Sequence, residues 1–112
     1  MEAYTALADA MMASFDDPGT LDRMVTMPVG EMPAAGLAGF RFVDLIVHAW
    51  DLAKATGQDT DIAPDLCEAA LAMSRQRMAD MDRANLPFKD EVPVPADAPA
   101  ANRLAGYLGR QV

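Results

Sequence analysis

The sequence predicts an all-α protein, and three observations favour this fold class. The 112 residues match the usual size of one domain, so we expect a single domain over residues 1–112. The apolar residues, 52% of the chain, include many alanines and methionines, which favour helix over strand. Apolar residues at helical spacing then predict three main helices and a short C-terminal helix, with an extended proline-rich strap before the last.

Residues 2–16 form the first predicted helix, because their large apolar residues recur at spacings of three and four. These residues are Tyr4, Leu7, Met11 and Phe15. The sequence DDPG at 16–19 ends this helix. The next segment, TLDRMVTMPVGEMP at 20–33, contains two prolines and a glycine, so we expect a connecting loop with extended backbone around residues 24–29.

The second predicted helix covers residues 34–55. Pro33 suits its first turn, where the missing N–H is not needed, and Gly57 suits the position just after its end. Apolar residues cover nearly all sides of this helix. They are Leu37, Phe40, Phe42, Val43, Leu45, Ile46, Val47, Trp50 and Leu52. A helix of this kind has to pack on several sides, so we expect it to be central in the bundle.

A third helix is expected over 64–83, because it opens with a proline, which suits the first helical position. It contains the one cysteine of the chain, Cys67, which we interpret as a small core residue rather than a nucleophile. The segment NLPFKDEVPVPADAP at 85–99 is too rich in proline for regular structure, so we expect an extended strap over the bundle. Its apolar anchors are Phe88, Val92 and Val94. Asp97 can cap a last short helix at 98–108.

Charge and composition exclude two classes of partner. The net charge is −8, from 17 acidic and 9 basic residues, and the lysines and arginines are scattered, so a nucleic acid would be repelled. No apolar run is long enough to cross a bilayer, and the N-terminal residues MEAYTALADA have no signal-peptide pattern. We therefore expect a cytoplasmic protein, and a single cysteine, which cannot form an internal disulfide, supports this expectation.

A polar stripe crosses the apolar second helix. It consists of Arg41, Asp44, His48 and Asp51, which share one narrow helical face. A carboxylate and an imidazole one turn apart can bind a single metal ion. Asp44 or Asp51 can equally hold the His48 ring by a hydrogen bond. The residues leave three interpretations open: a solvent-facing edge with surface ion pairs, a metal or catalytic site, and a partner interface.

Two longer stretches, DLIVHAWDLAKATGQ at 44–58 and VPVPADAPAANRLAGYLGR at 92–110, resemble a known family. They are similar to the mycothiol-dependent maleylpyruvate isomerase type of metal-binding domain, within the DinB-like superfamily of four-helix bundles. The resemblance extends over nearly the whole chain. It implies a DinB-like helical bundle and, most closely, an uncharacterised metal-binding subgroup of that superfamily.

The resemblance also implies a divalent metal, commonly zinc or nickel. Its ligands in this chain would be Asp44 and His48, with Asp51 as an auxiliary ligand or support. In the enzymes of this superfamily the metal activates a low-molecular-weight thiol such as mycothiol, and the thiolate attacks an electrophilic substrate. The resemblance therefore implies a metal-binding protein related to thiol-dependent transferases and isomerases.

The chain departs from the family pattern in one respect. Family members carry a further histidine ligand on the first bundle helix, and His48 is the one histidine here. The chain thus resembles three of the four bundle helices plus the C-terminal tail. We expect a homodimer in which a second copy fills the place of the missing helix. The alternative is a non-enzymatic, dimeric interaction module, or a degenerate remnant of such an enzyme.

Overall fold

A computed structural model gives the structure of residues 1–28 and 30–112. Val29, which belongs to the stretch expected to be extended, lies outside the described residues. The chain divides into two compact units, unit 1 at 1–40 and unit 2 at 41–112, and each is described by itself. The described residues are mostly helical, as predicted, with a small two-stranded sheet. No helix among them is long and apolar enough to cross a membrane.

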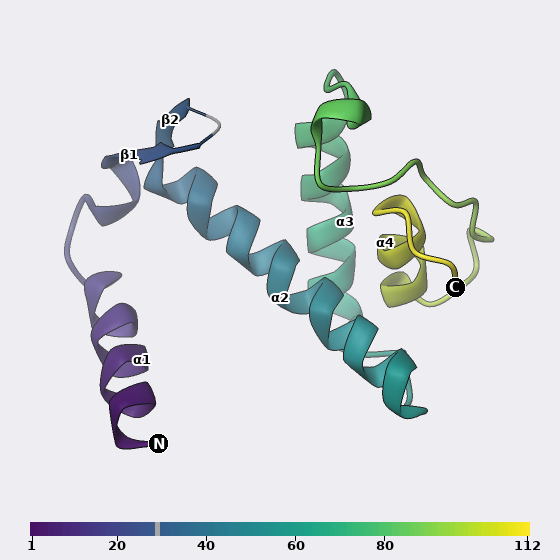
Figure 1. Cartoon of the computed structure of the whole chain (residues 1–112), viewed down its shortest axis with the longest axis horizontal. Helices are drawn as coiled ribbons and strands as arrows, with labels where there is room; N and C mark the ends of the chain where they lie inside the picture. Colours follow the sequence, from purple (N-terminus) through teal and green to yellow (C-terminus); the bar gives the residue numbers. More distant parts are fainter. Residues whose placement is uncertain (29) are drawn as a thin grey trace. The chain divides into compact units, whose positions relative to one another are not determined.

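Unit 1 begins with helix α1, which spans Glu2–Ser14 as the apolar spacing predicts (Figure 1). A short 3-10 helix follows at Thr20–Asp22. No residue of α1 is buried, and Tyr4 and Leu7 are 73% and 72% exposed. Most helices in proteins are stabilised mainly by burial of their apolar face. Among the described residues, none buries the apolar face of α1.

A hairpin follows where the sequence led us to expect a loop. Its strands are β1 (Met24–Met27) and β2 (Gly30–Pro33), which pair antiparallel with Met27 opposite Gly30. The extended backbone expected around residues 24–29 is confirmed over Met24–Met27, where β1 lies. The expectation of a loop without paired strands was wrong, because the β-branched residues of β1 and the glycine that opens β2 outweigh the two prolines. Gly30 has a φ of 118°, a backbone conformation that residues with a side chain rarely adopt.

Helix α2 spans Ala34–Thr56 and belongs to both units. We expected Pro33 in the first turn of this helix. It is instead the last residue of β2, and the helix begins one residue later, at Ala34. The end of the helix is as predicted. Gly57 has a φ of 68°, and the backbone N–H of Gln58 donates to the carbonyl of Ala53 at 2.9 Å.

Within unit 2, one face of α2 is buried and the opposite face is exposed. The buried face carries Val43, Val47, Trp50 and Ala53. Leu45 and Leu52, on the other side, are 71% and 63% exposed. The expectation that this helix packs on several sides is not met by the described residues of unit 2, because the other two helices of the unit cover only one side of it.

Helices α3 (Pro64–Met78) and α4 (Ala100–Tyr107) lie side by side and pack on the buried face of α2 (Figure 1). The main core side chains are Val43, Val47, Trp50, Cys67, Ala70, Leu71, Leu104, Tyr107 and Leu108. Cys67 is fully buried, which confirms its interpretation as a core residue. The core therefore rests on side chains from all three helices.

The third helix is shorter than predicted. It ends at Met78 rather than at residue 83. The carboxylate of Asp82 accepts a hydrogen bond from the backbone N–H of Ala84 at 3.0 Å and opens a 3-10 helix at Arg83–Asn85. A short acidic side chain of this kind competes with a helix for backbone groups, so residues 82–85 do not continue α3.

The last helix starts later than predicted, and its expected cap is absent. It begins at Ala100, directly after Pro99, and Asp97 does not cap it with its side chain. The backbone N–H of Ala98 instead donates to the carbonyl of Pro95 at 3.0 Å and closes a separate turn. Proline disfavours helical geometry in the residue before it, so the helix begins only beyond Pro99.

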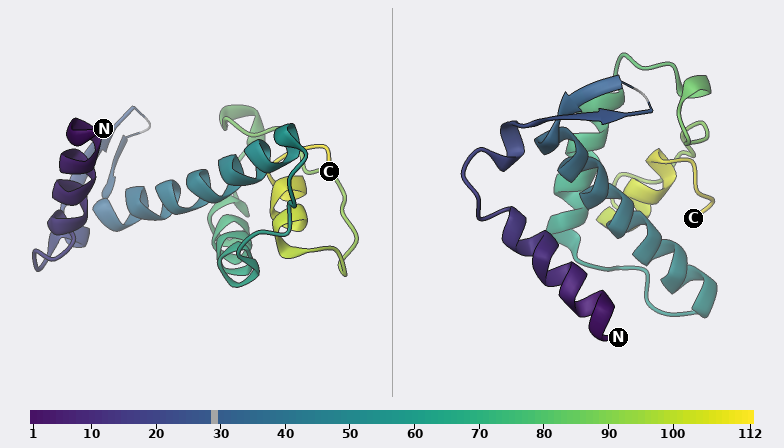
Figure 2. Two further views of the ribbon diagram at one scale, coloured as in Figure 1. Left: turned by 90° about the horizontal axis from the view of Figure 1, so that it is seen from below. Right: turned by 60° about the vertical axis from the view of Figure 1, so that its left-hand side comes forward.

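The strap begins at residue 86 rather than 85, because Asn85 ends the 3-10 helix, and it runs along the outside of α4 as far as residue 99 (Figure 2). The backbone N–H of Val92 donates to the carbonyl of Gly106 at 2.9 Å. A Cβ at position 106 would lie 2.3 Å from Cγ2 of Val94, so the strap can approach the helix this closely only at glycine. Phe88, Val92 and Val94 are half-buried, which confirms the extended, anchored strap.

Candidate metal site

The structure brings the three residues of the predicted site together on α2. Nε2 of His48 is 3.3 Å from Oδ1 of Asp44, and Nδ1 of the same ring is 3.1 Å from Oδ2 of Asp51. The helix repeat explains this arrangement, because residues three and four positions apart are neighbours on one face. The side chains of His48 and Asp44 are 62% and 43% exposed, so the site is open to solvent.

Asp51 has a second partner that the sequence did not reveal. Nε of Arg110 is 3.1 Å from Oδ1 of Asp51, and Nη2 is 3.0 Å from Oδ2, so the guanidinium holds both oxygens. Arg110 lies in the turn that ends α4. In this turn Gly109 has a φ of 86°, and the backbone N–H of Arg110 donates to the carbonyl of Ala105 at 2.9 Å. A glycine after a short helix signals a helix end, but no local signal identifies a carboxylate 59 residues away.

The Arg110 guanidinium also fixes the charge of Asp51. Its hydrogen bonds are the largest influence on the pKa of Asp51 and hold that pKa below its ordinary value, while burial acts in the opposite direction. The charge of Arg110 and the contact with His48 lower the pKa further. Asp51 is therefore ionised at neutral pH with both oxygens in use. We interpret it as the residue that holds the His48 ring rather than as an open metal ligand.

Asp44 has a weaker cationic partner. Nη1 of Arg41 is 3.3 Å from Oδ2 of Asp44, and the Arg41 side chain is 71% exposed. A pair this exposed contributes little, because solvent screens it and both side chains lose freedom. Oδ1 of Asp44 and Nε2 of His48 are left facing each other at the open side of the stripe.

These two facing atoms fit two corners of a tetrahedral zinc site. Zinc binds histidine nitrogen and carboxylate oxygen at about 2.0–2.1 Å, so neighbouring ligand atoms lie about 3.3 Å apart. Nε2 of His48 and Oδ1 of Asp44 are 3.3 Å apart. Zinc normally takes at least three protein ligands. Among the described residues, no group of three or more His, Cys, Asp or Glu side chains is placed to hold a metal ion. The described residues of one chain thus offer two of the four ligands of a tetrahedral site.

Cys67 lies outside this site. Its Sγ donates to the carbonyl of Ile62 at 3.1 Å within the core. Burial raises the pKa of the Cys67 thiol, and the charges of Asp61 and Glu68 act in the same direction. The thiol stays protonated at neutral pH and is a poor nucleophile or metal ligand.

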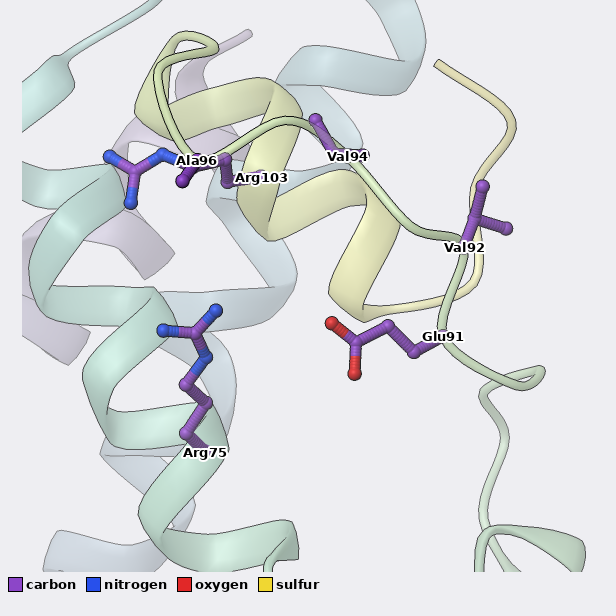
Figure 3. Close-up of a pocket in the computed structure, with 6 residues that line it drawn as sticks. All are labelled: Arg75, Glu91, Val92, Val94, Ala96 and Arg103. Atoms are coloured by element: carbon purple, nitrogen blue, oxygen red, sulfur yellow. The ribbon is translucent and has the colours of Figure 1, made fainter.

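A cavity of about 170 Å³ lies in another part of unit 2, between α3, α4 and the strap (Figure 3). It is lined by Arg75, Glu91, Val92, Val94, Ala96 and Arg103. Arg103 pairs with Glu68, and its Nε donates to the carbonyl of Ala98 at 3.0 Å. The guanidinium of Arg75 lies 5.8 Å from the ring centre of Tyr107. Both arginines thus have partners within the protein, and the cavity is a weaker candidate site than the stripe on α2.

Similarity to curated proteins extends over nearly the whole chain. The chain is 40% identical over 111 residues to the uncharacterized protein Rv0738 of Mycobacterium tuberculosis (strain ATCC 25618 / H37Rv), and equally to the uncharacterized protein MT0763 of strain CDC 1551 / Oshkosh. Each match covers 98% of this chain but 61% of the relative, so the chain spans less than two thirds of their length. No family model matches the chain, and no solved structure matches it.

Proposed function

We propose that this chain is a divalent-metal-binding protein of the DinB-like, mycothiol-dependent maleylpyruvate isomerase type. Asp44 and His48 are its metal ligands, and Asp51 supports the His48 ring. The observation that carries this proposal is the 3.3 Å separation between Nε2 of His48 and Oδ1 of Asp44, which fits two zinc ligands. The mostly helical fold and the motif at 44–58 support it.

A series of contacts holds His48 in a metal-binding orientation. Arg110 holds Asp51, and Asp51 in turn faces Nδ1 of the His48 ring. With Nδ1 protonated and donating to Asp51, Nε2 carries a lone pair that faces an oxygen of Asp44. The two lone pairs repel each other, and a cation bound by both atoms removes that repulsion. Proteins commonly orient a ligating histidine by a carboxylate on its other nitrogen.

The open side of the site suits a small-molecule ligand. When bound, a zinc or nickel ion would lower the pKa of a coordinated thiol or water. The exposure of His48 and Asp44, 62% and 43%, leaves room for a small thiol such as mycothiol and for an electrophilic substrate. The activity that follows is metal-dependent thiol transfer or isomerisation, as the family resemblance implies. We place it in the cytoplasm, as the sequence led us to expect.

A second function, that of a non-enzymatic interaction module, is favoured by a different observation. Leu45 and Leu52 are 71% and 63% exposed beside His48, where a partner helix can pack. In this alternative the His48 ring, with Asp44 and Asp51 on either side of it, forms part of a polar contact with the partner and no metal is bound. The two functions therefore differ in whether the site binds a cation.

Metal content per chain distinguishes them. Protein loaded with zinc or nickel and then desalted is analysed by inductively coupled plasma mass spectrometry, beside His48→Ala and the control Asp80→Asn, an exposed carboxylate beyond α3. We expect about half to one equivalent of metal in the wild type and the control, and about tenfold less in His48→Ala. Circular dichroism confirms that each variant is folded. A metal-free wild type would contradict the metal function and favour the interaction module.

A further inference from the structure

The exposed face of α2 has the spacing of a helix-pairing seam. Its residues are Arg41, Leu45, His48, Leu52 and Ala55, at alternating steps of four and three. This is the repeat by which one helix packs against another. Leu45 and Leu52 lie one turn to either side of His48 and are 71% and 63% exposed. The candidate metal ligand His48 thus stands between two exposed leucines on this face of five residues, which we call the α2 seam.

Small residues allow another helix to come close to this seam. Ala49 and Ala55 are exposed next to His48 and Leu52, and neither carries a side chain beyond Cβ. Helix axes can then approach to the short end of the usual range, about 8 Å. At that distance, side chains beside the seam, such as Asp44, lie within reach of the facing helix.

From this seam and the incomplete ligand set we infer that zinc joins two copies of the chain through their α2 seams, with Asp44 and His48 of each copy as the four ligands. The inference rests on the proposed metal function. In a two-fold contact the same surface of each copy faces its equivalent, so any residue near the axis is present twice. Two donors per chain become four donors, which is the number that closes a tetrahedral site.

Charge and area indicate that the contact needs the metal. Each chain carries a net charge of −8, and the contact brings the Asp44 carboxylate of one copy near that of the other. The two leucines and the alanines beside them offer on the order of 300 Å² per copy, or about 600 Å² for both copies, which is well below the total of about 1,200 Å² at which stable interfaces begin. A cation both neutralises the carboxylates and adds four bonds. We therefore expect dimers with zinc and monomers without it.

The test measures the molar mass and the zinc content of the full chain together. Light scattering after size-exclusion chromatography is run with zinc and with a chelator, on the wild type, His48→Ala, Leu45→Lys and the control Asp80→Asn. The wild type and the control should double in mass with zinc, at about one zinc for two chains. His48→Ala should stay monomeric. Leu45→Lys, which leaves the ligands in place, should need at least about tenfold more zinc to dimerise.

The possible outcomes separate this inference from the proposed function. Zinc bound at one equivalent to a chain of monomer mass would overturn the inference and keep the metal function. Chains that bind no zinc would overturn both. A dimer that persists in chelator and in His48→Ala would show that the copies associate by another surface, which also overturns the inference. Circular dichroism of each variant excludes misfolding as the reason for a lost dimer.

Discussion

Units 1 and 2 each contain an amphipathic helix, and the apolar face is buried in unit 2 but exposed in unit 1. Leu104 of α4 is 1% exposed, whereas Leu7 of α1 is 72% exposed. Both residues lie at helical spacing among other apolar residues, and the sequence predicts a buried face for each. In unit 2 three helices share a core, while in unit 1 no residue of α1 is buried. Apolar spacing therefore identifies the face that a helix can bury, but it does not identify the surface that covers this face.

Truncating one leucine in each unit gives the largest expected contrast. Leu104→Ala removes a side chain from the core and should lower the free energy of unfolding by about 2–5 kcal/mol, because a cavity remains. Leu7→Ala should change it by less than about 0.5 kcal/mol. Urea unfolding followed by far-ultraviolet circular dichroism measures both. A loss above about 1 kcal/mol in Leu7→Ala would show that a surface covers α1 in solution.

A pair of helical glycines sharpens the comparison. In Gly106→Ala the new Cβ would lie 2.3 Å from Cγ2 of Val94 and 2.7 Å from the carbonyl oxygen of Val92, so the strap has to move. We expect a loss of about 1–3 kcal/mol. In unit 1, Gly36→Ala meets Sδ of Met32 at an ordinary 3.5 Å and should be neutral or stabilising by up to about 1 kcal/mol. Equal effects at the two positions would contradict the close approach of the strap.

The smallest expected contrast lies between two ion pairs. Arg110→Met removes the partner of Asp51 and should cost about 1 kcal/mol at pH 7, because this pair is bidentate and partly buried. Arg23→Met removes the partner of Asp17 in unit 1, where the two side chains are 65% and 55% exposed, and should cost less than about 0.5 kcal/mol.

The cost of Arg110→Met should also depend on pH. The pKa of Asp51 is lower in the folded chain than in the unfolded chain, so the unfolded state binds more protons as the carboxyl titrates. The contribution of Asp51 to stability is complete above its unfolded pKa of about 3.9 and is lost as the pH falls through the folded value. Unfolding measured from pH 7 down to the acid limit should show wild type and variant converging. A constant difference would mean that Arg110 acts through packing alone.

Local signals predicted the helices well and the long-range contacts poorly. Alanine content, proline positions and Gly57 placed most helix boundaries within a few residues, because those signals act on the nearest turn of backbone. Asp44, His48 and Asp51 were placed together by the helix repeat alone. Arg110 was missed, because its contact with Asp51 arises from the packing of α4 against α2.

The hairpin and the missing cap were errors of a different kind. At each position two sequence signals predicted different structures, and our prediction rested on the signal that has the smaller effect on the backbone. Prolines argued against strands at 20–33, but Gly30 at a φ of 118° opens the second strand of a hairpin. Asp97 argued for a cap, but Pro99 placed the helix start beyond its reach. Such competition is settled by backbone geometry that composition does not encode.

The single tryptophan gives the protein a built-in optical probe of one unit. The Trp50 ring is 3% exposed, and its Nε1–H donates to Oδ1 of Asn102 on α4 at 2.9 Å. Its fluorescence will shift to the red when α4 separates from α2, because the indole then meets water. Circular dichroism records the helices of both units. The two signals followed on one sample will show whether residues 1–40 lose their structure before, or together with, residues 41–112.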